Sequence, residues 1–473
     1  GRMCLDAAGY QTRRGDIKRV NGKGESMTFE NKGKENNGAT YGRRSDWQNL
    51  YTIAKKYYEA LLADPGNAQF HLTDPRGASD KSGRTFNNPY QYFFEQMHMD
   101  DAIYADESIY EYPMQQGGGN DGRPYSFGRP SSGGSKAAYP CKSYGQGRIN
   151  PAYFYGIFDP NDMRRDVSIT MTGSNGKGVE KLIPFVPNSK AEGGGLTLNK
   201  WDENRQANPW VAAQRKSGIN GPYMRMSEVY LGYAEVCAAL GDVVTGKQYL
   251  KTVRERSFPQ GLADTDGFIA SFGNDLVRAI IEERGFEYAG EGDRRWTLIR
   301  SGYLPEDIKR IKDMTKAMMD GLATKGYYEF ENGNIISAYI WTKLVDAKTI
   351  YGHRLTAQCP MDKVNDPVLY PGWRGQKDNW EEMGLNYGNS APATNLAIKG
   401  LFEIVSEEEA ASLESQGYAK VNWGIDLVDY RDEYDKYLFW DYDYVSAPIY
   451  LWPFTPNVMA AGGFTNGYGF KQE

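Results

Sequence analysis

The chain has 473 residues, of which 14% are aromatic and 25% are charged, and it carries a formal net charge of -6 with an isoelectric point near 5.5. This acidic balance argues against a nucleic-acid partner, because a protein that binds nucleic acid normally has a basic surface. No apolar run approaches the roughly 18 residues that a membrane-spanning helix needs, whereas the chain is long enough to bury a sizeable core.

The first part of the chain predicts a loop followed by a helix. Residues 9–44 are rich in glycine, lysine, arginine and asparagine and have little periodicity, which is typical of a long loop. Ser45 then opens a predicted helix, with Gln48 three positions later completing a capping box, and Asp64-Pro65-Gly66 ends it. We therefore expect residues 45–112 to form a helical scaffold segment. The predicted buried stripe of this helix contains Trp47, Leu50, Tyr51, Ala54, Tyr58 and Leu61.

Residues 113–222 predict a region rich in loops. Before it, residues 87–113 combine a short helix with the strand-like segment ESIYEY. Residues 114–146 contain so much glycine, serine and proline that they have too few apolar side chains to form a core, and no phosphate-binding glycine motif occurs there. The remainder holds one short β-like run, VSITMTG, and the loop KWDENRQANPW, which contains two tryptophans.

Residues 223–323 predict a helical core. Apolar side chains recur from Met226 to Leu240 at the spacing of one helix face, and Gly241 follows where a left-handed cap would lie. A second helix can start near Thr245, and because the connection is so short the two helices must form an antiparallel hairpin. A third helix is predicted from about Asp275.

Charged residues crowd the end of that third helix. Glu283, Glu287 and Asp293 alternate with arginines, which predicts a compact ion-pair cluster. Acid-base catalysis would need a cleft that the sequence does not show. The arginines are Arg284, Arg294, Arg295 and Arg300.

The C-terminal part predicts one more helix, near residues 305–323, and then a variable region over 324–473. Carboxylates and aromatic residues crowd positions 429–444, where they could hold a structural calcium ion, but their spacing matches no EF-hand loop and favours a solvated acidic face. The four cysteines and three histidines lie far apart, so we expect no zinc site and no cofactor.

Three ordered segments carry a resemblance to a known family. The run VRER, IEERGFE, EGDRRW and LIR, the segment FDPNDMRRD and the ending YLWPFTPNVMAAGGFTNGYGF resemble the SusD/RagB family, with its Glu-Arg-x-x-Glu, Glu-Gly-x-Arg, Asp-x-Arg and Leu-x-Pro-Ile-Pro patterns. The chain departs from the family pattern at Gly290, Thr297 and Gly467, where an aromatic residue, aspartate and proline are usual.

The resemblance implies a mostly α fold. We expect one SusD-like domain over residues 1–473, built on a TPR-type scaffold of helical hairpins with a loop-rich subdomain and few short strands. The opening GRMCLDAA is similar to the start of a helix that lies well inside the family's polypeptide. An N-terminal portion with the lipidated cysteine is therefore expected outside this chain segment, so that a lipid anchor there would provide the membrane attachment.

The resemblance also implies a function. Such a protein would capture oligosaccharides or polysaccharides at the cell surface and deliver them to a SusC-like TonB-dependent transporter in the outer membrane, without catalysis. One alternative is the peptide-binding component of a RagAB-like uptake complex. Another is a glycoside hydrolase, which would need two carboxylates facing each other at about 5 to 10 Å, and no such pair stands out.

The loops of residues 150–223 are the expected ligand surface of such a protein. Aromatic rings can cover the C–H face of a sugar while amides and guanidinium groups bind its hydroxyls. The competing interpretation is that the rings are buried beneath the loops. The expected stacking residues are Tyr153, Tyr155, Trp201 and Trp210, and the expected hydroxyl-binding residues are Asn204, Arg205 and Gln206.

Overall fold

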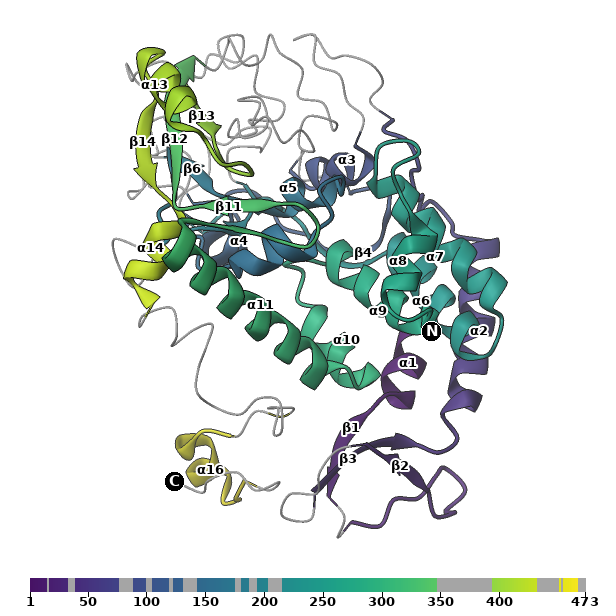
Figure 1. The fold of residues 1–473 in the computed structure, drawn as a ribbon. Coiled ribbons are helices and arrows are strands. Elements are labelled where there is room, and N and C mark those ends of the chain that lie inside the picture. Colours follow the sequence, from purple (N-terminus) through teal and green to yellow (C-terminus); the bar gives the residue numbers. More distant parts are fainter. Residues whose placement is uncertain are drawn as a thin grey trace.

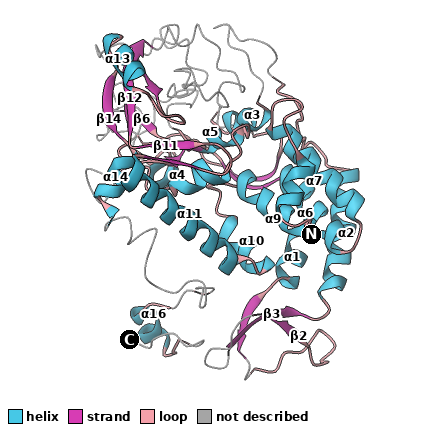
Figure 2. Cartoon of the chain, viewed as in Figure 1, coloured by secondary structure: helices cyan, strands magenta, loops and turns pink. Residues whose placement is uncertain are grey.

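The computed structural model describes residues 1–14, 17–32, 39–75, 88–98, 104–118, 122–130, 143–174, 180–186, 194–202, 215–346, 394–431, 451 and 454–466. Helices are the predominant regular structure in this part of the chain, and the strands are short (Figures 1 and 2). The helices are α1 (Arg2–Ala8), α2 (Trp47–Ala63), α3 (Pro89–Gln96), α4 (Gly122–Phe127), the π-helix η1 (Tyr153–Ile157), α5 (Arg164–Ser168), α6 (Met226–Ala239), α7 (Val243–Ser257), α8 (Thr265–Ser271), α9 (Leu276–Glu287), α10 (Arg294–Ser301), α11 (Leu304–Lys325), α13 (Glu407–Ser415), α14 (Gly424–Asp429) and α16 (Pro456–Gly462).

The strands pair in small antiparallel sheets of two or three members. In the described residues the pairings are β1 with β3 with β2, β4 with β9, β5 with β8, β6 with β7, β10 with β11, and β13 with β12 with β14. The strands are β1 (Gln11–Arg14), β2 (Phe29–Asn31), β3 (Ala39–Arg44), β4 (Ser108–Tyr112), β5 (Ile169–Thr170), β6 (Thr172–Ser174), β7 (Glu180–Leu182), β8 (Thr197–Leu198), β9 (Gly221–Arg225), β10 (Tyr327–Glu329), β11 (Ile335–Ser337), β12 (Tyr339–Asp346), β13 (Thr394–Lys399) and β14 (Ala419–Asn422).

Helix α6 lies at the centre of the helical body. One apolar cluster joins it to α1 and α2, and a second joins it to α7 and α9. Eleven of its 14 residues are buried, so the helix is covered nearly all round, although the sequence predicted a single stripe. Gly241 has φ +91°, which ends α6, and α7 starts at Val243, so the predicted helical hairpin is confirmed.

The largest core cluster lies at the other end of the molecule. Side chains from η1, α11, β11 to β13 and α14 meet there around Trp423, whose indole N–H donates to the Tyr155 hydroxyl at 2.9 Å. Phe185 packs on the same indole with ring centroids 4.2 Å apart. Helix α11 runs between this cluster and α10, and thus links the two halves of the fold (Figure 1).

Two local predictions near the N-terminus were wrong. Residues 9–44 contain the sheet β1-β3-β2, where the sequence predicted a loop, because antiparallel pairing across a long connection leaves no local periodicity. The predicted capping box is absent as well, since the N-cap of α2 is Asp46, whose carboxylate binds the Arg44 guanidinium at 2.7 Å. The predicted stripe of α2 is confirmed, with Tyr51, Ala54 and Tyr58 buried.

None of the helices in the described residues has both the length and the apolar content that a bilayer crossing would require.

Candidate functional site

The expected hydroxyl-binding residues Asn204, Arg205 and Gln206, together with Trp210, lie in residues 203–214, outside the described part of the chain. The other three expected ligand residues can be placed, and each is used for packing.

Trp201 is only 3% exposed and packs against Leu198 and Ile219. Its indole N–H finds no hydrogen-bond partner among the described residues, and the guanidinium of Arg123 lies 5.7 Å from its ring. A ring that is covered in this way offers no face to a sugar.

Tyr153 and Tyr155 lie on the π-helix η1 and point into the largest core cluster. Tyr155 has no exposed surface, and its hydroxyl accepts the hydrogen bond from Trp423. The Tyr153 hydroxyl donates to the Gly285 carbonyl at 2.8 Å, which ties η1 to α9. Burial raises the pKa of both phenols, consistent with rings held in a dry interior. In this structure both tyrosines are packing residues.

The predicted ion-pair cluster is present only in part. Arg284 pairs with Asp293 as expected, but Glu283 and Glu287 bind arginines from other segments of the chain. Glu287 binds the guanidinium groups of Arg164, Arg225 and Arg256, and its contact with Arg164 measures 3.0 Å. Five cations and five carboxylates form one network that joins α5, the end of β9, α7, α9 and the residue before β4, so the buried charges balance. The members are Glu107, Asp162, Arg164, Lys200, Arg225, Arg254, Arg256, Glu283, Glu287 and Glu291.

This network is part of the scaffold. Glu287 and Arg225 are almost completely buried, and no side chain in the network is more than 7% exposed. A buried ion pair adds little net stability, because the cost of removing its charges from water can exceed the attraction between them. A ligand has no access to these charged groups.

Two departures from the family pattern are also explained. The Thr297 hydroxyl donates a hydrogen bond to Asp293 at 2.8 Å and accepts one from the Arg284 guanidinium. Thr297 therefore bridges the ion pair between Arg284 and Asp293, whose charged atoms lie 2.6 Å apart. Gly290 has φ +79°, and a Cβ there would stand 2.4 Å from a methyl group of Leu198. A larger residue would not fit at this position without a shift of the chain.

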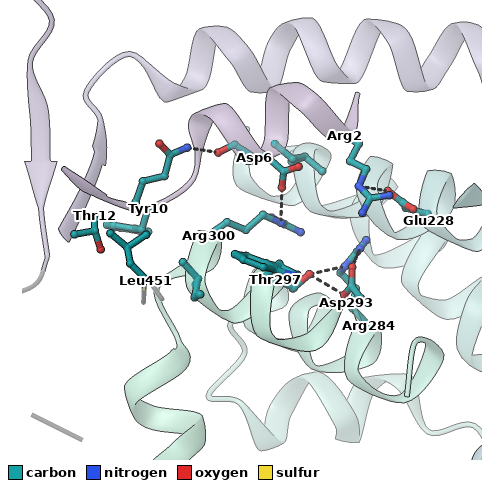
Figure 3. Close-up of a pocket in the computed structure, with 14 residues that line it drawn as sticks. Arg2, Asp6, Tyr10, Thr12, Glu228, Arg284, Asp293, Thr297, Arg300 and Leu451 are labelled. Carbon is teal, nitrogen blue, oxygen red and sulfur yellow. Dashed lines mark hydrogen bonds and ion pairs between the residues drawn. The ribbon is translucent and has the colours of Figure 1, made fainter. Parts of the chain in front are cut away.

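An open cavity of about 410 Å³ lies between α1, the start of β1, the first turn of α6 and α10 (Figure 3). Trp296 contributes an indole that is 63% exposed, whereas most of the polar lining is paired. The lining residues are Arg2, Leu5, Asp6, Tyr10, Gln11, Thr12, Glu228, Arg284, Asp293, Trp296, Thr297, Ile299, Arg300 and Leu451.

Ion pairs fix the charged groups of the cavity. Arg2 reaches Glu228 at 3.4 Å across the gap between α1 and α6, and Arg300 approaches Asp6 at 3.8 Å (Figure 3). Arg284 contacts Asp293, as described above. The cavity wall therefore presents compensated charges and hydrogen-bonding groups together with one exposed indole.

Two carboxylates of this wall, Glu228 and Asp293, have pKa values that are shifted in opposite directions. Burial raises the pKa of Glu228 above its usual range. Burial would also raise that of Asp293, but the adjacent Arg284 outweighs this effect and lowers it. Each carboxylate forms an ion pair with an arginine, so both carboxylates stabilise the wall of the cavity. Among the described residues, no cluster of three metal-ligating side chains occurs, and the segment considered for calcium, residues 429–444, is mostly outside them.

Sequence reasoning missed this cavity, because its lining comes from five separate stretches of the chain. Trp296 offered the one available signal, as a large aromatic residue next to EGDRR in an otherwise amphipathic helix. Position alone could not show that its ring is exposed.

Comparison with known proteins identifies a family. The model of the SusD family matches residues 68–453, which is most of the chain. No curated protein matches the sequence.

Several solved structures are similar to part of the chain. A SusD homolog from Bacteroides thetaiotaomicron is 17% identical, with 56% of this chain and 52% of that chain covered and a TM-score of 0.40. Surface glycan-binding protein A from the same organism, in complex with laminarihexaose, is 18% identical, with 55% and 52% covered and a TM-score of 0.38. Surface glycan-binding protein A from Bacteroides uniformis is 19% identical, with 54% and 46% covered and a TM-score of 0.36. The chain thus spans about half the length of each.

Proposed function

This chain belongs to the SusD family, and from that premise we propose that it is a glycan-binding protein of the cell surface without catalytic activity. It captures oligosaccharides and delivers them to a SusC-like TonB-dependent transporter in the outer membrane. A lipid anchor outside this chain segment provides the membrane attachment.

Family membership over residues 68–453 is the observation that supports this proposal most strongly. The chemistry of the open cavity is compatible with it, since an exposed indole beside compensated polar groups can cover an apolar sugar face and bind hydroxyls. Trp210 and its neighbours Asn204, Arg205 and Gln206 remain proposed contacts.

The alternative of peptide capture predicts a different ligand preference. A peptide site would bind main-chain amides through many polar groups and would depend little on aromatic faces. Binding of a mixed peptide library, together with no binding of any glycan, would favour this alternative over ours.

The hydrolase alternative can be tested on one pair of carboxylates, Glu228 and Asp293. Both line the cavity, and the pKa of Glu228 is raised while that of Asp293 is lowered. We expect no release of reducing ends from any glycan that binds. Release that is abolished by Glu228→Gln or by Asp293→Asn, with binding retained, would show catalysis and overturn the proposal.

The first experiment is a binding screen. Affinity electrophoresis of the purified protein in gels that contain neutral or acidic polysaccharides, followed by calorimetry, reports capture directly. Laminarihexaose belongs in the panel because one of the matched structures contains it. Retardation by at least one polysaccharide is expected, and migration unchanged by all of them would contradict the proposal.

A further inference from the structure

Three tyrosines form an exposed cluster on the β4–β9 ladder, separate from the residues discussed above as ligand contacts. Tyr110 and Tyr112 belong to β4 and Tyr223 belongs to β9, and they are 53%, 48% and 48% exposed. Their ring centroids lie 5.4 to 5.9 Å apart. We refer to these three residues as the tyrosine surface.

Strand geometry puts the three rings on one face. Tyr110 and Tyr112 are two residues apart in β4 and so point the same way, and the neighbouring strand brings Tyr223 to within 5.5 Å of Tyr110 and 5.4 Å of Tyr112. The residue between the first two, Glu111, points inward and is buried. The ladder is thus an amphipathic sheet with the unusual property that its aromatic residues face outward.

The inward face anchors this ladder firmly. Glu111 accepts hydrogen bonds from the Ala105 amide at 2.9 Å and from the Asn220 side chain at 2.8 Å, and it also binds the Ser108 hydroxyl. Arg225, at the end of β9, belongs to the buried ion network. The backbone that carries the tyrosines is therefore fixed by contacts on its buried face.

The rings also hold one another. Each pair meets edge to face, with interplanar angles of 71° to 85°. The guanidinium of Arg2 lies 5.3 Å from the centroid of the Tyr223 ring and donates a hydrogen bond to the carbonyl oxygen of that residue at 3.3 Å. Because these contacts already restrict the side chains, a ligand would lose little additional conformational entropy on binding.

The chemistry of the tyrosine surface favours a sugar over an apolar partner. Each ring offers an apolar surface next to a hydroxyl, which matches the alternation of C–H faces and hydroxyls on a pyranose. Arg2 is paired with Glu228, so its charge is compensated, which favours a neutral glycan over an acidic one. An apolar protein surface or a lipid would be matched better by leucine or phenylalanine, because these side chains have no hydroxyl group that must stay hydrated.

Arg2 links the tyrosine surface to the cavity. Arg2 contacts Tyr223 and also lines the cavity, as does its partner Glu228. A chain of several sugar units could therefore lie on the tyrosines and reach past Arg2 toward Trp296.

We propose that Tyr110, Tyr112 and Tyr223 form a binding surface for a neutral oligosaccharide. This inference rests on the proposed function and adds to it a location and a ligand class. The surface comes from the pairing of two strands more than a hundred residues apart in sequence.

The test compares single alanine variants of the three tyrosines with Tyr430→Ala. Tyr430 is 47% exposed and follows α14, far from β4 in Figure 1, so it is a matched control. Calorimetry with the neutral glycan that the wild type binds best should show affinity about tenfold weaker for each of the three variants, by analogy with bases that stack on aromatic rings. The control should bind like the wild type.

Thermal unfolding checks that the variants are folded, and Tyr112→Phe, which keeps the ring, should retain most of the affinity. Wild-type binding that none of the three alanine variants weakens would overturn this inference and leave the proposed function intact. A wild type that binds no glycan at all would overturn the proposed function, and this inference with it. If the variants instead lose a dimer in sedimentation while glycan affinity is unchanged, the tyrosine surface is an interface between copies and the proposal is wrong.

Discussion

Replacing Glu287 by glutamine should destabilise the fold more than any change of an exposed carboxylate. Glu287 has no exposed surface and binds three guanidinium groups, from Arg164, Arg225 and Arg256. Glutamine keeps the shape but removes the charge, so the balanced network is left with one uncompensated positive charge in a dry environment. Breaking a buried ion pair from one side costs about 3 to 5 kcal/mol.

This cost can be translated into a melting temperature. An unfolding entropy of about 2.1 cal/mol/K per residue amounts to roughly 1 kcal/mol/K for a chain of this length. A loss of about 4 kcal/mol should therefore lower the melting temperature by roughly 4 °C if the chain unfolds as one unit. Urea unfolding followed by tryptophan fluorescence gives the free energy, and scanning calorimetry gives the temperature.

Two further variants make the test specific. Glu408 is exposed on α13, so Glu408→Gln should change the free energy of unfolding by less than about 0.5 kcal/mol. Adding Arg256→Met to Glu287→Gln restores the charge balance, so the double variant should be less destabilised than the sum of the two single variants. A free energy of unfolding for Glu287→Gln within about 1 kcal/mol of the wild type, or two single changes whose effects simply add, would show that Glu287 does not balance the charge of this network.

Two other predictions concern buried groups. Tyr155→Phe removes the acceptor of the Trp423 hydrogen bond and should cost about 1 to 3 kcal/mol of stability, while glycan affinity stays unchanged; weaker binding at wild-type stability would instead make Tyr155 a ligand residue. Burial would raise the pKa of Glu282, but Arg294 and Arg310 outweigh it and lower the pKa to about 2. A lowered folded-state pKa contributes stability that is present above the unfolded value and lost as pH falls through the folded one. Stability should thus decline from about pH 4.5 to 2, and less steeply in Glu282→Gln; parallel curves for the two proteins would contradict this assignment.

The sequence predicted the elements whose signals are local. The stripe of α2, the presence of helix α6, the hairpin connection at Gly241 and the start of α9 at Asp275 all depend on residues within a few turns of one another. Helical periodicity and caps act over that range, so a single sequence contains them.

The elements that depend on distant pairing could not be predicted in this way. The sheet β1-β3-β2 forms between segments that carry no alternation of apolar residues, and β4 pairs with β9 across more than a hundred residues. The same limit applies to charge, because Glu287 binds Arg164 and Arg225, neither of which is close to it in the sequence.

The candidate site shows the limit most clearly. Tyr153, Tyr155 and Trp201 lie in a loop-rich region, and the composition of that region suggested exposed rings, yet these side chains fill the interior. Tyr110, Tyr112 and Tyr223 lie in strands, where rings are usually half-buried, yet they face outward. The exposure of a side chain depends on which face of its helix or strand the rest of the fold covers. That information cannot be read from a single sequence.

Whether the protein captures glycans without cleaving them can be decided in one experiment. The purified protein is titrated by calorimetry with the glycan that retards it most in affinity gels, and the recovered glycan is then assayed for reducing ends. Saturable binding with no increase in reducing ends is the predicted result. The absence of binding to every glycan in the panel, or binding accompanied by release of reducing ends, would contradict the account of a capture protein without catalysis.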